Sequence, residues 1–109
     1  MKEERFKQGQ LRYMTKGISE GLPIEIQILL WGMTDRLRVV KELDYLQVFE
    51  LETIGDREKG VLVQVITHSQ EQPKYSRTYY IPMAGNGATG KVYIIDDGEH
   101  ATMLWADEY

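Results

Sequence analysis

At 109 residues the chain is close to the commonest size of a single domain, and its 42% apolar and 28% charged residues are typical of a globular protein. It contains no cysteine, which excludes disulfides, thiolate zinc sites and cysteine nucleophiles. The formal net charge of −4 divides into +3 over residues 1–41 and −7 over residues 42–109, so only the N-terminal arm approaches the basic surface that nucleic acids require.

We interpret that arm, residues 1–10 of a single domain spanning 1–109, as a solvated terminus of the kind that is often flexible. Its charged sequence lacks the apolar run of a secretory signal, and the longest apolar run, Ile28 to Trp31, is too short to cross a bilayer. We therefore expect a cytoplasmic protein with neither a membrane nor a nucleic acid as its partner.

A short strand is expected from Leu11 to Thr15, and one long helix follows it, from about Leu22 to Lys41. Pro23 suits the first helical turn, where its missing N–H has no partner to lose. Apolar residues recur in this helix at alternating steps of four and three, which places them on one core-facing stripe: Ile26, Leu30, Met33, Leu37 and Val40.

The residues after the helix are typical of strands, which we predict at 45–54, 61–66, 75–81, 92–96 and 99–105. The last two strands flank Asp97-Gly98, a pair that tolerates the positive φ angles of a type I′ turn. A two-residue loop at that pair places Ile94 opposite Ala101 on one face of the hairpin. The predicted fold is therefore α+β, with one amphipathic helix, about residues 22–41, packed on an antiparallel sheet of four to six strands.

Two motifs suggest chemistry that their context argues against. Residues 85–91 contain G-x-G-x-x-G and a near P-loop, but a strand follows where phosphate binding requires a helix, and Val92 replaces the required Ser or Thr. The acidic segment 96–100 suggests a metal site, yet an exposed hairpin tip explains its acids, and the only histidine outside it is His68. We assign no catalytic residues and expect no metal and no cofactor.

A denser polar segment, His68, Ser69, Gln70 and Glu71, is a candidate polar site. In an extended chain Ser69 points to the face opposite His68, so these two side chains do not form a nucleophile–base pair. His68 and Glu71 are able to approach each other around a turn, where they would act as acid and base. The structural alternative is that these side chains cap a loop and bond its backbone.

The outer stripe of the predicted helix consists of Ile24, Ile28 and Trp31, opposite the core-facing stripe, where a surface helix is normally polar. One interpretation is that the N-terminal arm folds back and covers this stripe with Phe6 or Leu11. The other is that the stripe is an interface with another protein or with a second copy of this chain, since tryptophan is a preferred anchor of such interfaces.

Four segments of the sequence carry a resemblance to a known family. They are Arg12–Ile18, Asp44–Glu50, His68–Glu71 with Pro73, and Val92–Asp97. Together they resemble domain-of-unknown-function family 960, a group of small proteins of Gram-positive bacteria, over about residues 11–109. The family brings no activity with it, so the resemblance implies a bacterial cytosolic protein and nothing about mechanism.

These features lead to three functional hypotheses. The first is a non-enzymatic module that binds another protein, or a homodimer partner, through the outer stripe of the helix. The alternative is a small enzyme that uses His68 and Glu71 as acid and base. The weaker alternative is an acidic decoy that binds a DNA-binding protein, which the charge of −7 after residue 41 suggests, although the acids are scattered along the sequence.

Overall fold

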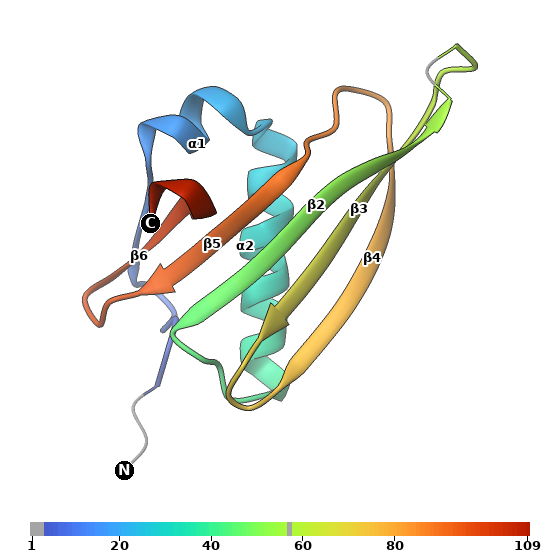
Figure 1. Cartoon of the computed structure of the whole chain (residues 1–109). Coiled ribbons are helices and arrows are strands. Elements are labelled where there is room, and N and C mark those ends of the chain that lie inside the picture. Colours follow the sequence, from blue (N-terminus) through green and yellow to red (C-terminus); the bar gives the residue numbers. More distant parts are fainter. Residues whose placement is uncertain (1–3, 57) are drawn as a thin grey trace.

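The structure is a computed structural model that describes residues 4–56 and 58–109. Its elements follow one another in the order β1 (Leu11–Met14), α1 (Lys16–Gly21), α2 (Ile24–Val40), β2 (Leu46–Asp56), β3 (Val61–Gln70), β4 (Tyr75–Met83), β5 (Gly90–Asp96), β6 (His100–Trp105) and η1 (Ala106–Glu108). The strands form one sheet and α2 lies across one of its faces (Figure 1). This arrangement confirms the predicted α+β fold.

The sheet has six strands in the order β1-β6-β5-β2-β3-β4. Every neighbouring pair is antiparallel except β1 and β6, which run parallel and pair Leu11 with His100. The predicted sheet was antiparallel throughout, and the parallel pair arises because the first strand lies beside the last one. Such a pair needs a long connection, which here contains both helices and the four intervening strands.

The helical region contains two helices instead of the single predicted helix 22–41, because the helical conformation is interrupted at Leu22 and Pro23. Six residues form α1, whose first turn is capped by Thr15, since its Oγ1 accepts a hydrogen bond from the Ile18 N–H at 3.2 Å. Pro23 then serves as the N-cap of α2. A helix as short as α1 has too few turns for periodicity to reveal it.

Most of the predicted core stripe of α2 is buried in the core that the helix shares with the sheet, including Ile26, Leu30, Met33 and Leu37. Val40 was assigned to the same stripe but is 80% exposed. It is the last residue of α2, where the helix has passed the packed centre of the sheet and lies beside the edge strand β4.

The last hairpin turns one residue later than the sequence indicated. Ile94 faces Met103 and Asp96 faces Ala101, so the register is two residues away from the predicted one. The carboxylate of Asp97 accepts hydrogen bonds from the N–H groups of Glu99 and His100, at 3.2 and 3.0 Å. Asp97 is therefore the first residue after β5, and Gly98, which follows it in the turn, takes the positive φ angle of 103°. Because the register shift is even, each side chain keeps its predicted face.

Candidate functional site

The outer stripe of α2 is partly exposed. Ile24 and Ile28, one helical turn apart, are 57% and 64% exposed. Trp31 is half-buried and packs against the edge of the core. Two large aliphatic side chains are therefore exposed to solvent on this face, and a half-buried aromatic ring lies on the same face.

Arg12 of β1 contacts the Trp31 ring. Its guanidinium carbon lies 4.5 Å from the ring centroid, and the same guanidinium forms an ion pair with Asp35, one turn further along α2. This contact differs from the predicted cover, because Leu11 is 64% exposed and Phe6 is buried within the core. Arg12 thus fixes the orientation of the Trp31 ring and leaves Ile24 and Ile28 open.

The N-terminal segment is tied to the sheet through Asp96. Its carboxylate accepts hydrogen bonds from the Phe6 N–H at 2.6 Å, the Gln10 side chain at 3.0 Å and the Gly98 N–H at 2.7 Å. Asp96 is only 3% exposed, which corrects its predicted place on an exposed hairpin tip. Within residues 4–56 and 58–109, no group of three or more His, Asp and Glu side chains is arranged to hold a metal ion.

The predicted polar segment does not form one site. His68 is fully buried on the side of the sheet covered by α2, while Glu71 is exposed in the turn that follows β3. Ser69 pairs with Val48 on the opposite side of the strand, as the alternation predicts. The structure therefore does not bring His68 and Glu71 together as an acid and a base.

The environment of His68 is aromatic and largely apolar. Its ring stacks on Phe49, with centroids 4.4 Å apart, and meets the edge of Tyr75 at 5.5 Å. Its Nε2 lies 2.6 Å from Gln47 Oε1, whereas its Nδ1 has no partner among the described residues. Burial lowers the pKa of His68 from 6.5 to about 4, because the charged ring would lose its hydration there.

The glutamines around His68 determine which ring nitrogen carries the proton. The Gln47 amide nitrogen donates to the Asp44 carbonyl at 2.9 Å and to Gln70 Oε1 at 2.8 Å, which leaves Gln47 Oε1 as an acceptor. His68 must then donate from Nε2, and its Nδ1 is unprotonated. The neutral, buried ring of His68 therefore has a structural role in the core, where it stacks on Phe49 and hydrogen-bonds Gln47.

Gln70 bonds loop backbone, as the structural alternative for this segment predicts. Its Nε2 donates to the carbonyls of Glu42 and Pro73, at 3.1 and 2.7 Å, and its Oε1 accepts from the Asp44 N–H at 3.0 Å. These bonds join the loop after α2 to the turn before β4, which contains the cis peptide bond at Pro73.

The structural importance of these glutamines was not predicted from the sequence. Gln64 performs the same role at the other end of the sheet, where its amide donates to the Ala88 carbonyl at 2.9 Å and accepts from the Ala88 N–H at 2.7 Å. The strand pattern of the sequence did contain a signal for this role. These glutamines alternate with apolar residues in strands, which indicates that their side chains face inward, and a buried amide must find hydrogen-bond partners.

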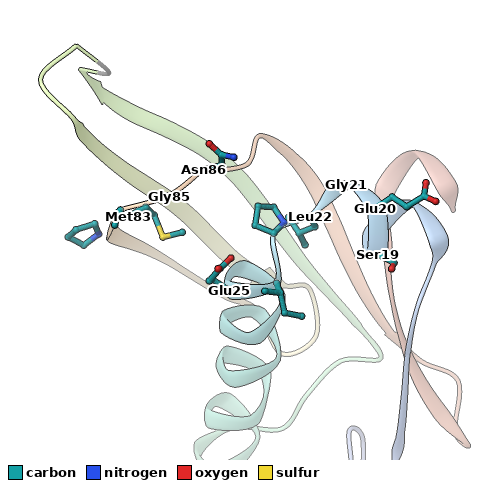
Figure 2. Close-up of a pocket in the computed structure, with 12 residues that line it drawn as sticks. Ser19, Glu20, Gly21, Leu22, Glu25, Met83, Gly85 and Asn86 are labelled. Carbon is teal, nitrogen blue, oxygen red and sulfur yellow. The ribbon is translucent and has the colours of Figure 1, made fainter.

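The glycine-rich segment lines a cleft of about 690 Å³ between the helices and the loop from β4 to β5. Gly85 and Asn86 lie on the loop side, while Glu20 and Glu25 come from the two helices (Figure 2). Both charged residues that line the cleft are acidic. Lys91, the lysine of the P-loop-like motif, does not line the cleft, and its Nζ lies 4.0 Å from Oε1 of Glu50 on β2. This charge is unsuited to phosphate, in agreement with the interpretation of the segment as a loop.

The geometry defines a small two-layer α+β domain with an exposed apolar helix face. Residues 11–108 match the sequence pattern of the family described as "Staphylococcal protein of unknown function (DUF960)". The chain therefore belongs to this family. This confirms the resemblance of the four sequence segments. In the part of the chain that the structure describes, no helix is long and apolar enough to span a membrane.

A solved structure has the same architecture over almost the whole chain. It is described as the "Crystal structure of the protein of unknown function from Enterococcus faecalis" and is 25% identical in sequence, with a TM-score of 0.78. The match covers 99% of this chain and 98% of that chain. No curated protein matches this chain significantly.

Proposed function

We propose that this domain is a non-enzymatic interaction module that binds another protein, or a second copy of itself, through Ile24, Ile28 and Trp31. The observation that carries the proposal is the exposure of Ile24 and Ile28, each more than half open to solvent. Full burial of such a side chain contributes roughly 1.5–3 kcal/mol, so covering both would favour association considerably.

The state of Trp31 supports the same proposal. Arg12 and Asp35 hold the ring region in place before any partner arrives. An interface that is ordered in the free protein loses less conformational entropy on binding. A partner would then cover the two isoleucines and the open part of a ring that is already positioned.

The enzyme hypothesis has less support. An acid or base must reach its substrate, and the side chain of His68 is 0% exposed. The decoy hypothesis requires acids spaced like phosphates along one face, whereas the acids of this chain are scattered along its sequence.

The proposal is tested with Ile28→Asp, which places a charge in the outer stripe. We expect the wild-type chain to self-associate in analytical ultracentrifugation, or to retain a partner when it is used as bait in native cytosol. The variant should lose that association, because an unpaired carboxylate would be buried in the interface.

Val40→Asp is the matched control. Val40 is 80% exposed on the same helix but points about 120° away from Ile28 around the helix axis, so the control should associate as the wild type does. Both variants should unfold close to the wild-type temperature, because surface substitutions usually change stability by about 0.5 kcal/mol or less. Equal association of wild type and Ile28→Asp would refute the proposed interface.

A further inference from the structure

Strand β4 has an open backbone edge. It is last in the strand order, and among residues 4–56 and 58–109 it pairs with β3 alone. Figure 1 shows it as the outermost strand, on the side of the sheet away from β1 and β6. The N–H and C=O groups on its outer side are therefore available to a further strand, except that Pro82 has no N–H.

A groove of about 700 Å³ runs beside this edge, between β4 and α2. Leu29, Met33 and Val40 contribute to its helix wall, and Tyr75, Tyr79 and Ile81 to its strand wall. The strand residues alternate along β4, so they share the face of the sheet that α2 covers. A further strand beside β4 would place every second side chain in this groove.

The charges of the groove are all of one sign. Arg36 of α2 and Arg77 of β4 are the only charged residues that line it. Arg77 lies over the Tyr79 ring, 4.9 Å from its centroid. Within the described part of the chain, neither arginine forms an ion pair with an Asp or Glu side chain, although the chain carries a net charge of −4.

We propose that this groove binds an extended segment of another protein, which adds to β4 as an edge strand and places apolar side chains and a carboxylate in the groove. The open edge provides the main-chain hydrogen bonds, and the pockets for alternate side chains provide specificity. The two arginines select a carboxylate, because the planar guanidinium binds this group bidentately.

A second copy of this chain fits the groove less well. Pairing of β4 with β4 of another copy would bring Arg77 of both copies onto the same face of one continuous sheet. Each groove would then meet the arginines of its partner instead of a carboxylate. The inference is independent of the proposed function, because the groove and the outer stripe lie on different flanks of α2.

The test measures fluorescence anisotropy of the labelled peptide Thr-Val-Thr-Glu-Thr-Val-Thr with the full-length protein. This sequence reads the same in both directions, so the experiment does not presuppose a parallel or antiparallel strand. The control peptide carries Lys in place of Glu. We expect saturable binding of the Glu peptide and binding of the Lys peptide that is weaker by about tenfold or more. Alternate N-methylation of the Glu peptide should abolish binding, because it removes strand hydrogen bonds.

Charge reversal then assigns the binding to the groove. Arg77→Glu should weaken binding of the Glu peptide and strengthen binding of the Lys peptide, which a merely structural defect would not do. Lys91→Glu alters the net charge equally on the opposite face of the sheet and should keep the wild-type preference. Ile28→Asp should also keep it, so failure of the outer-stripe proposal is distinguishable from failure of this one.

Three results would overturn the inference. The first is the lack of saturable binding of the Glu peptide up to about 1 mM. The second is equal affinity for the Glu and Lys peptides, or a preference that Arg77→Glu leaves unchanged. The third is a dimer in analytical ultracentrifugation that Arg77→Glu dissociates, which would assign the groove to a second copy of this chain.

Discussion

The pH dependence of stability depends strongly on His68. In the folded protein its ring stays neutral down to about pH 4, whereas in the unfolded chain it takes up a proton near pH 6.5. Between these values the unfolded state binds more protons, so the free energy of unfolding decreases as the pH falls through this window. Above pH 6.5 both states are neutral, and His68 has no such effect.

The size of this effect follows from the shift of the pKa from 6.5 to about 4. Each pKa unit corresponds to about 1.4 kcal/mol, so protonation of His68 should remove about 3 kcal/mol of stability between pH 7 and pH 4. This is a large part of the 5–15 kcal/mol that is typical of a domain.

Urea unfolding at a series of pH values measures this contribution in the wild type and in His68→Gln. Glutamine retains a side-chain N–H for Gln47 Oε1 and does not titrate. The variant should be less stable at pH 7, since it loses the stacking on Phe49, but it should lose about 3 kcal/mol less than the wild type on acidification.

His100→Gln is the matched control because it removes the other histidine, whose side chain is 36% exposed and pairs with Asp97 at 2.9 Å. This control should retain the acid sensitivity that His68 confers. NMR titration of the His68 ring gives a direct measurement. A pKa at or above 6.5, or equal pH profiles of His68→Gln and His100→Gln, would refute the account of the buried neutral imidazole.

Three further predictions concern the fold. Phe6→Ala should destabilise the domain by about 3–5 kcal/mol in urea unfolding, because it truncates a buried ring; a change below 1 kcal/mol would contradict the packing of the N-terminal segment. Trp31→Gln should cost about 2 kcal/mol in thermal unfolding, since half of the ring is buried and Arg12 loses its contact; a cost above 4 kcal/mol would place the ring in the core. Gly98→Val should cost about 1–3 kcal/mol, because valine resists a φ of 103°, and an unchanged melting temperature would place the turn elsewhere.

The fold was predictable from the sequence wherever one periodicity extended over many residues. The steps of four and three in α2 correctly identified Ile26 and Leu30 as core residues, and the alternation in the last hairpin gave each strand its correct faces. The register was wrong because it depends on the carboxylate of Asp97, which accepts two N–H groups and moves the turn by one residue. Side-chain capping of this kind leaves no periodic pattern.

The candidate sites were predictable only in part. The spacing of Ile24 and Ile28 indicated a second apolar face, and both side chains are exposed. The contact of Arg12 on Trp31 joins a strand to a helix, so local sequence does not reveal it. The burial of His68 was not predictable for a related reason, because the polar sequence of residues 67–70 favours a loop although these residues extend β3. A polar run of sequence therefore does not distinguish a loop from a buried strand when the buried side-chain amides hydrogen-bond to one another.

The position of β1 has a consequence for the synthesis of the protein. Among the described strands β1 is made first, but its partner β6 is made last, and the two pair from Leu11 to Met14 with His100 to Met103. Until β6 leaves the ribosome, β1 has no strand to join, and Thr15 also lacks the Met103 carbonyl that accepts its N–H at 3.1 Å. We therefore expect the N-terminal segment to stay accessible to proteases and chaperones throughout translation. Nascent chains arrested before residue 100 should be cleaved near β1, whereas the released protein should be protected there.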